Sequence, residues 1–497
     1  MKIRNFTDIK SFFLENKTLK QTIFKNTFWL VVAEGVSRLL ELILLIYLAR
    51  ILGATEYGKF IFVLAFINLF FIFTDFGISQ ITTREFSQNR EKEKEFSNLL
   101  SLKLLLCLGT LFLILIGSFF ITPDYLIRKV IWIFAAFSVI EGFLLIIFAF
   151  FQAKQKMEYQ AGTKIFGTTV VTAIGFFIIF NFPSVENLSY GYLFGSLVTL
   201  IFVLIFFHFK IFRLALSWNK TIWQKFLALS WPLALATAFV SIYTQIDSVM
   251  MGYLKQITQI GWYNAAYKII GGFFILAGLI SMSFFPALSK FFKESKEKLQ
   301  KIWNYFMELM IFLAIPIVIG GITLAPRIID FIYDPSFFPS GRETILAFQI
   351  LIIMTGVAFL SNPFNQILIA ANQQKKLLWA TFSGSAVNVI LNLILIPKYS
   401  LYGAAATILV THLLIFFLVF RFTLKFTPIR PLNLEFFFNF LSAILAVIPM
   451  YFVIIQPTIY HLNVILSVLI GTAIYLICFL MYKNLLNKLF ISRVQIL

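Results

Sequence analysis

Apolar windows of about twenty residues recur along the whole chain and leave only short polar connectors between them. The windows cover residues 26–49, 60–80, 98–122, 130–152, 165–182, 190–209, 226–251, 261–285, 302–325, 344–371, 377–397, 403–420, 436–455 and 463–482. A backbone surrounded by lipid must satisfy its own hydrogen bonds, so segments of this length cross a membrane as helices. We therefore expect an all-α integral membrane protein with about 14 transmembrane helices.

The distribution of charge supports this expectation and orients the chain. The 497 residues are 60% hydrophobic and 13% charged, and the formal net charge is +19. The basic residues lie in short connectors rather than on a soluble face, which argues against a nucleic-acid partner. With the N-terminus inside, about thirty of the 41 Lys and Arg fall in cytoplasmic loops and tails and about eight in the opposite loops. This asymmetry predicts a multi-pass membrane protein with both termini in the cytoplasm.

Signals for metals, cofactors and nucleotides are missing from the sequence. Cys107 and Cys478 lie in different apolar windows, and His208, His412 and His461 have no ligand spacing. The sequence also lacks a Gly-x-x-x-x-Gly-Lys-Ser/Thr phosphate loop. We therefore predict no metal, no cofactor and no ATP hydrolysis, so transport would draw on an ion gradient, the membrane potential or the gradient of the substrate.

An aromatic residue next to a glycine opens several of the windows, and the spacings suggest an internal repeat. Gly58 and Gly261 are 203 residues apart, and Gly191 and Gly403 are 212 apart. Two similar offsets favour two six-helix lobes in parallel repeat, although Tyr and Gly also favour membrane interfaces and helix starts in general. Such lobes are typical of alternating-access transporters with a substrate site between them. The predicted divisions are an N-lobe at 1–225, a C-lobe at 226–428 and a terminal helix pair at 429–497.

The first window carries three charges, Glu34, Arg38 and Glu41. Their i, i+4, i+7 spacing places them on one helical face. Arg38 lies about twelve residues into the window, where its guanidinium cannot easily reach either surface. One interpretation is a structural triad that locks two helices. Because buried ion pairs stabilise poorly compared with apolar packing, we favour a water-filled cavity that accepts an anion.

Asn264 and Lys268 form a second polar pair, at i, i+4 in the window at 261–285. Lys268 could face Arg38 across the cavity, or its long side chain could extend to the outer surface. Three further carboxylates lie within windows: Asp75, Glu141 and Asp247. Each could bind a coupling proton or Na⁺, or neutralise a nearby base. We rank Asp247 first because Tyr243 and Gln245 lie close to it in sequence.

Two late windows carry uncharged polar stripes. The first consists of Asn362, Asn365 and Gln366, and the second of Thr381, Ser385, Asn388 and Asn392. Such stripes either form hydrogen bonds between helices or line a route for hydroxyl-rich cargo. We include Asn362, Asn365, Gln366, Asn388 and Asn392 among the candidate substrate contacts.

Four segments resemble the signatures of bacterial polysaccharide-repeat flippases, which belong to the multidrug/oligosaccharidyl-lipid/polysaccharide exporter superfamily. These are "RILGATEYGKF" at 50–60, "DSVMMGYLKQITQIGWYNAAYKI" at 247–269, "FPALSK" at 285–290 and "LNLILIPKYSLYGAAATIL" at 391–409. The resemblance implies a fourteen-helix inner-membrane protein that moves an undecaprenyl-pyrophosphate-linked oligosaccharide from the cytoplasmic to the outer leaflet. Related peptidoglycan-precursor flippases carry basic residues on helices one and eight, where this sequence has Arg38 and Lys268.

Two rival functions are weighed against this one. A multidrug or cation exporter of the same superfamily is expected to have an acidic and aromatic cavity and twelve helices. A polysaccharide polymerase or ligase needs a sizeable outer loop with catalytic residues, and the longest outer connector, around "APRIIDFIYDPSFFPSGRE", is under about twenty residues and has no His. We therefore predict a transporter and not an enzyme. The expected partners are the lipid-linked oligosaccharide, the bilayer and possible polymerase and glycosyltransferase proteins of a lipopolysaccharide or capsule pathway.

Overall fold

The computed structural model describes residues 15–16, 18–88, 95–210, 215–333, 342–460 and 462–494, apart from the side chains of 19–20 and 487–494. The regular elements in this part of the chain are helices, without a β-strand. In order they are α2 (Leu19–Asp75), α3 (Ile78–Gln88), α4 (Phe96–Ile121), α5 (Tyr125–Ala153), α6 (Met157–Asn181), α7 (Val185–Lys210), α8 (Lys220–Tyr253), α9 (Ile257–Glu294), α10 (Lys296–Ile332), α11 (Glu343–Ala370), α12 (Gln374–Phe426), α13 (Leu434–Ile454), α14 (Pro457–Tyr460) and α15 (Val464–Val494). Polar side chains cap the first turn of several helices, as at Thr18, Asp124, Asn219, Ser295 and Asn433.

Twelve helices in the described ranges are long and apolar enough to cross a membrane. Two of them, α2 and α12, contain 57 and 53 residues. A straight helix of that size would be about 80 Å long, far more than the roughly 30 Å of a hydrocarbon core. Each contains one break in helical geometry at a residue with positive φ, Gly53 (76°) in α2 and Ser400 (51°) in α12.

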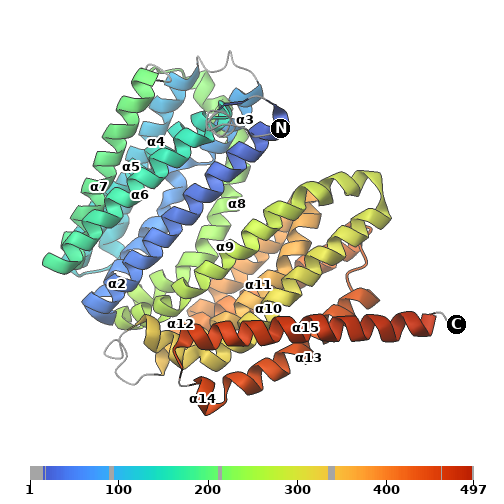
Figure 1. Ribbon diagram of the computed structural model, residues 1–497. Coiled ribbons are helices and arrows are strands. Elements are labelled where there is room, and N and C mark those ends of the chain that lie inside the picture. Colours follow the sequence, from blue (N-terminus) through green and yellow to red (C-terminus); the bar gives the residue numbers. More distant parts are fainter. Residues whose placement is uncertain are drawn as a thin grey trace, which may run out of the picture. The chain divides into compact units, whose positions relative to one another are not determined.

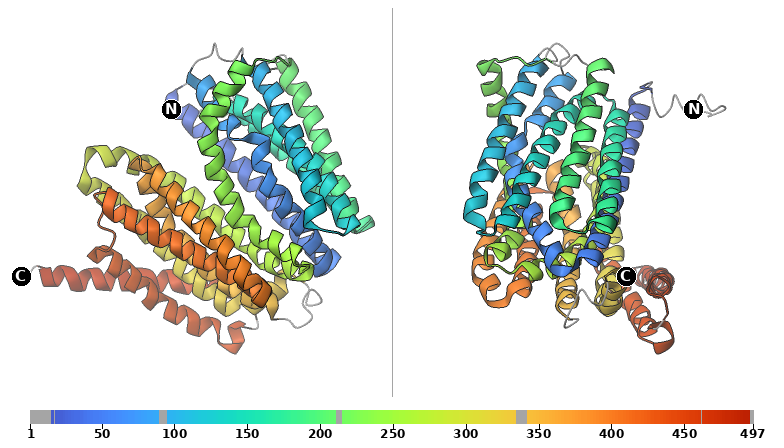
Figure 2. Two further views of the ribbon diagram at one scale, coloured as in Figure 1. Left: turned by 180° about the vertical axis from the view of Figure 1, so that it is seen from behind. Right: turned by 90° about the vertical axis from the view of Figure 1, so that its left-hand side faces the viewer.

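The chain reverses direction at Gly53. The first segment of α2 runs parallel to α6, because hydrogen bonds advance together along both: Asn26 to Gln155, Lys164 to Glu34 and Thr168 to Ser37. The second segment runs antiparallel to α4, with Phe66 near Gly117 and Asp75 bonded to Lys103. Since α4 and α6 are separated by the single helix α5, they point the same way. The two segments of α2 therefore cross in opposite directions, as the ribbons in Figures 1 and 2 show.

The chain also reverses at Ser400, where α12 forms a helical hairpin. Asn388 donates to Thr411 at 3.1 Å, and a Cβ placed on Gly384 would meet Ile415. The two residues of each contact are separated from Ser400 by nearly the same number of residues, one before it and one after it. This is the pattern of antiparallel segments. The twelve helices thus comprise fourteen membrane-length segments within the described ranges, in agreement with the predicted count of about 14.

Contacts within the chain define two compact units, residues 1–261 and 262–497. The first contains α2 to α8 and the second α10 to α15, while the boundary falls within α9. Aromatic side chains fill both cores, with Phe96 and Phe150 in the first and Trp303 and Phe364 in the second. In the second unit, α13 and α15 pack together beside α10. The predicted lobe boundaries and their parallel repeat stay a prediction.

Two of the four glycines that suggested the repeat, Gly58 and Gly261, meet in one close contact within the first unit. A Cβ placed on Gly58 would lie 2.0 Å from the backbone oxygen of Ile257, and one on Gly261 would lie 2.2 Å from that of Ala54. Between them, the hydroxyls of Thr55 and Thr258 lie 2.8 Å apart. The contact is symmetric, because Ala54, Thr55 and Gly58 each precede their counterparts Ile257, Thr258 and Gly261 by the same 203 residues. The second segment of α2 and the start of α9 thus approach to a distance that only glycine permits.

Candidate functional site

The predicted charged face of α2 is present in the first unit. Arg38 Nε donates to Glu34 Oε1 at 2.5 Å, one helical turn away. The Arg38 side chain is 54% exposed and the Glu34 side chain 42%. Glu41 lies on the same face and is also exposed. These side chains are therefore exposed rather than enclosed in a buried triad.

A second cation, Lys164 of α6, joins this face. Its Nζ donates to Glu34 Oε2 at 2.5 Å, and its side chain is 33% exposed. One turn further along, Thr168 donates to Ser37 at 3.1 Å, which fixes the register of α6 against α2. One carboxylate thus holds two cations, and the three side chains form a cluster that we call the Glu34 cluster (Glu34, Arg38, Lys164).

Sequence reasoning missed Lys164 because it lies one residue before the window at 165–182 and counts there as a loop residue. The parallel pairing of α2 and α6 moves it beside Glu34, seven residues into α6. Glu141 of α5, predicted as an ion-coupling residue, lies close enough to Lys164 and Glu41 to interact electrostatically with both. The structure therefore adds Lys164 and Glu141 to the three residues of the predicted charged face.

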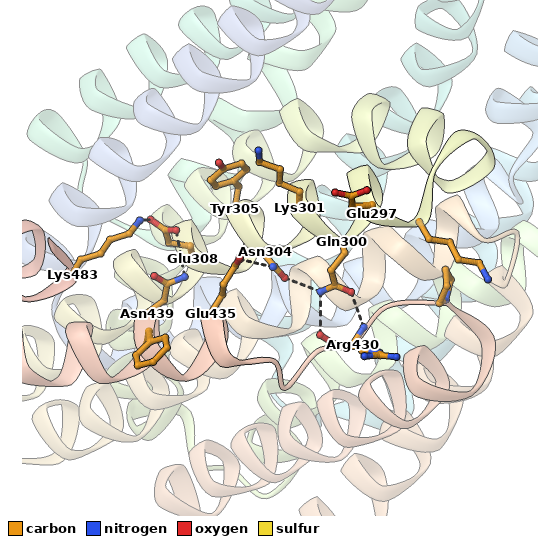
Figure 3. A pocket seen from close by; sticks show the side chains of 13 residues that line it. Glu297, Gln300, Lys301, Asn304, Tyr305, Glu308, Arg430, Glu435, Asn439 and Lys483 are labelled. Carbon is orange, nitrogen blue, oxygen red and sulfur yellow. Dashed lines mark hydrogen bonds and ion pairs between the residues drawn. The ribbon is translucent and has the colours of Figure 1, made fainter. Parts of the chain in front are cut away.

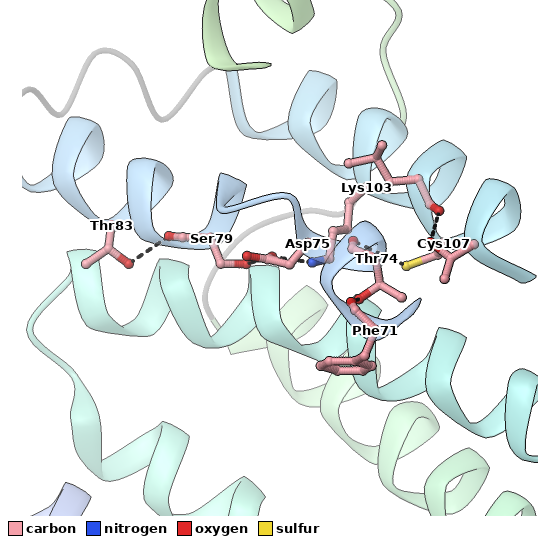
Figure 4. A network of polar contacts seen from close by, with 9 residues as sticks. Phe71, Thr74, Asp75, Ser79, Thr83, Lys103 and Cys107 are labelled. Carbon is pink, nitrogen blue, oxygen red and sulfur yellow. Dashed lines mark hydrogen bonds and ion pairs between the residues drawn. The ribbon is translucent and has the colours of Figure 1, made fainter. Parts of the chain in front are cut away.

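Asp75 belongs to a different network, at the break between α2 and α3 (Figure 4). Its carboxylate accepts hydrogen bonds from Ser79 and from the ammonium of Lys103, a side chain with 0% exposure. Cys107 lies one turn from Lys103 and contacts the Thr74 carbonyl at 3.9 Å. Of the two roles predicted for Asp75, neutralising a nearby base matches these contacts.

Lys103→Met should lower the free energy of unfolding by about 3 kcal/mol, because it leaves the Asp75 carboxylate, whose side chain is only 15% exposed, without its cation. The double variant Lys103→Met, Asp75→Leu should recover most of this loss, since both charges are gone. Thermal unfolding in detergent measures both effects. Equal stability of the single variant and the wild type would contradict a structural pair.

The candidate residues of the second unit show varied environments. Asn264 is buried and Lys268 half-buried on α9. Asn362 accepts from Ser281 at 3.1 Å and donates to the Ala358 carbonyl at 3.0 Å. Lys268 belongs to the second unit and Arg38 to the first, so the predicted pairing of the two across a cavity stays a prediction.

The remaining amides divide into two groups. Asn365 and Gln366 on α11 are half-buried, and Asn365 Oδ1 is a buried atom without a hydrogen-bond partner in the described part of the chain. Asn388 and Asn392 are 1% and 0% exposed, and Asn392 donates to Asn388, which donates to Thr411. Through Asn388, these last two amides are hydrogen-bonded to the second segment of α12. This contact matches the first role considered for such stripes, hydrogen bonding between helices. Both amides are buried, and their predicted role as substrate contacts stays a prediction.

Asp247 on α8 is 2% exposed, and its carboxylate accepts from the Ser248 backbone N–H at 2.7 Å. Among the residues that the structure describes, no three His, Cys, Asp or Glu side chains are grouped so that they could hold a metal ion. His461 lies outside the described residues.

Comparisons with known proteins match most of the chain. The family model described as "Polysaccharide biosynthesis protein" matches residues 23–292, and the model described as MatE matches residues 232–394. The capsular polysaccharide biosynthesis protein CapF of Staphylococcus aureus is 23% identical over 398 residues, which cover 78% of this chain and 96% of that protein. A putative O-antigen transporter of Escherichia coli (strain K12) is 21% identical over 414 residues, covering 82% of this chain and 97% of the relative.

Solved structures show the same fold at low identity. The lipid II flippase MurJ, in an inward closed conformation, aligns with a TM-score of 0.74 and 19% identity, covering 93% of this chain and 99% of that structure. An inward-facing multidrug resistance MATE family transporter of the MOP superfamily aligns with a TM-score of 0.64 and 15% identity, covering 80% and 97%. These alignments establish a MurJ- and MATE-like helical fold for this multi-pass membrane protein.

Proposed function

The chain belongs to the polysaccharide biosynthesis protein family, and from this premise we propose that it is a flippase for a lipid-linked oligosaccharide. Its substrate is an undecaprenyl-pyrophosphate-linked repeat unit, which it moves from the cytoplasmic to the outer leaflet of the inner membrane by alternating access. Relatives named as a capsular polysaccharide biosynthesis protein and an O-antigen transporter support this substrate class. The pathway would be the assembly of a capsule or lipopolysaccharide.

The observation that carries the proposal is the Glu34 cluster. A lipid-linked pyrophosphate presents several anionic oxygens on one polar head, and its polyprenyl tail stays in the lipid. The Arg38 guanidinium binds phosphate oxygens in a bidentate manner, and the Lys164 ammonium adds a second, more compact charge. Both cations are partly exposed and are held in place by the same carboxylate. Glu34 thus positions two phosphate ligands and limits the positive charge when no substrate is bound.

The transport direction requires both termini in the cytoplasm, as the positive charges of the inner loops predict. Reporter fusions after Ser184, in the turn between α6 and α7, should respond as outside. Fusions after Ser295, in the turn between α9 and α10, should respond as inside. The same response at both positions would overturn this orientation.

Coupling to an ion gradient is part of the proposal. Glu141 and Asp247 are its candidate carboxylates: Glu141 lies near the Glu34 cluster, and Asp247 is buried within α8. Asp75 is less suited, because Lys103 and Ser79 both donate to its Oδ1 and Lys103 already balances its charge. Asn264, Lys268, Asn362, Asn365 and Gln366 remain proposed substrate contacts of the second unit.

Deletion of the gene in its host tests the proposed function. The lipid-linked repeat unit should accumulate in the cytoplasmic leaflet, and the surface polysaccharide should be lost. The rival multidrug exporter predicts the opposite pattern, with normal surface polysaccharide and greater sensitivity to cationic drugs. A polymerase or ligase predicts that single repeat units reach the outer leaflet and remain unpolymerised or unattached there.

A further inference from the structure

A polar groove of about 850 Å³ lies in the second unit, away from the residues discussed so far. Its walls come from the first turns of α10, the connector between α12 and α13, and parts of α13 and α15 (Figure 3). Its lining residues are Lys296, Glu297, Gln300, Lys301, Asn304, Tyr305, Glu308, Pro428, Arg430, Glu435, Phe438, Asn439 and Lys483. The proposed function makes no use of this groove.

The floor of the groove is a chain of hydrogen bonds whose polar groups are satisfied. Gln300 accepts from the Arg430 backbone N–H at 2.8 Å and donates to the carbonyl of the same residue at 3.1 Å. Gln300 also donates to Asn304 at 2.8 Å, and Asn304 donates to Glu435 at 2.5 Å. At the other end, Glu308 accepts from Lys483 and Asn439. The connector after α12 and the terminal helices α13 and α15 are thereby fixed against α10.

The side chains of three cations in the lining take no part in this hydrogen-bond network. Lys296, Lys301 and Arg430 are exposed, and none of their side chains pairs with a carboxylate among the described residues. Of the three carboxylates in the lining, Glu308 is paired with Lys483 and Glu435 accepts from Asn304. Glu297 lies in the first turn of α10, where the helix dipole stabilises a negative charge. The four cations and three carboxylates of the lining leave a formal net charge of +1, so the groove offers a small excess of positive charge above a hydrogen-bonded floor.

We propose that this groove binds the headgroup of an anionic phospholipid of the cytoplasmic leaflet. The groove lies at the end of α10 that the charge pattern places in the cytoplasm, and basic pockets between transmembrane helices on that side attract anionic headgroups. Tyr305 and Phe438 supply apolar walls beside the cations. Leu434 and Phe437, both more than half exposed on α13, continue the apolar surface along which acyl chains can lie. A bound lipid would add a further link between α10 and the terminal helices.

Lipid titration of the purified full-length protein, followed by native mass spectrometry, tests this proposal. Phosphatidylglycerol is the probe and phosphatidylcholine the neutral reference. The wild type should bind phosphatidylglycerol at least about ten-fold more tightly. Each neutralised cation should weaken this binding by roughly five-fold, so that the triple variant Lys296→Gln, Lys301→Gln, Arg430→Gln loses the preference. These side chains are exposed and unpaired, so the variant should keep the wild-type unfolding temperature.

A matched control removes three exposed lysines from the same predicted side of the membrane, Lys220→Gln, Lys225→Gln and Lys375→Gln. It should keep the wild-type preference for phosphatidylglycerol. An unchanged preference in the groove variant, or an equal loss in the control, would overturn the proposal. Displacement of phosphatidylglycerol from the groove by inorganic phosphate would instead identify a site for a soluble phosphate. If the triple variant does not fold, Lys301→Gln alone should still show its five-fold loss.

Discussion

Replacing Arg38 or Lys164 with glutamine is expected to slow transport of the lipid-linked substrate by about 10- to 100-fold, because each loses a charge-assisted hydrogen bond to phosphate. The unfolding temperature should change little. Both side chains are at least a third exposed, and exposed ion pairs typically contribute about 1 kcal/mol or less to stability. Loss of transport without loss of stability is the signature of a ligand contact. Transport in proteoliposomes and thermal unfolding of the same preparations measure the two quantities.

Two further variants sharpen this prediction. Arg38→Lys keeps the charge but loses the bidentate fork, so its transport rate should fall between those of the wild type and Arg38→Gln. Lys129→Gln is the matched control, since Lys129 forms a similarly exposed pair with Glu186 at 2.6 Å away from the Glu34 cluster. It should transport at the wild-type rate. Normal transport by Arg38→Gln at normal abundance would rule out the phosphate contact, and unfolding of both Arg38 variants would favour a structural triad.

Gly58→Ala and Gly261→Ala should each destabilise the protein by about 1–3 kcal/mol or more, because the new methyl group meets a backbone oxygen that cannot turn aside. The built Cβ positions lie only 2.0 and 2.2 Å from those oxygens. The substitution is informative because alanine is the better helix former by about 1 kcal/mol, so any loss must come from the contact. Thermal unfolding, together with elution as a single peak from a size-exclusion column, measures the effect.

Gly109→Ala is the control for this pair, since a Cβ there meets nothing within 4 Å on α4. It should be neutral or slightly stabilising. If Gly58→Ala proved as stable as Gly109→Ala, the close crossing of α2 and α9 would be wrong.

The sequence predicted the transmembrane segments well because lipid imposes a simple rule on each of them. Backbone groups in the membrane must be bonded within their own helix, so every crossing appears as an apolar window. The chain reverses at Gly53 within α2 and at Ser400 within α12. Even these two reversals, each at a single non-helical residue, appear in the sequence as gaps between apolar windows. The break at Phe76 and Gly77 was missed, because the apolar run continues to residue 80 and hides the start of α3.

The candidate site was predicted only in part, because its assembly depends on helix pairing. The spacing of Glu34, Arg38 and Glu41 fixed their common face within one helix. Nothing in the sequence indicates that α6 lies parallel to α2 in the register that brings Lys164 to Glu34. For the same reason, the amide stripe on α12 could not be assigned, since Asn388 either faces a partner segment or a cavity. The helical hairpin at Ser400 brings Asn388 against Thr411, a contact that favours the hydrogen bond between helical segments.

The most direct test of the central claim is a flipping measurement with the purified protein. Proteoliposomes would carry a fluorescent undecaprenyl-pyrophosphate-linked oligosaccharide in both leaflets, and a membrane-impermeant glycosidase added outside would cut the exposed fraction. With the wild-type protein, cleavage should proceed beyond the outer leaflet pool, because molecules from the inner leaflet are brought out. With Arg38→Gln and Lys164→Gln combined, cleavage should stop at that pool, as in protein-free vesicles. Equal cleavage in wild-type and protein-free vesicles, with a protein that is folded and correctly inserted, would contradict the assignment of this chain as a lipid-linked oligosaccharide flippase.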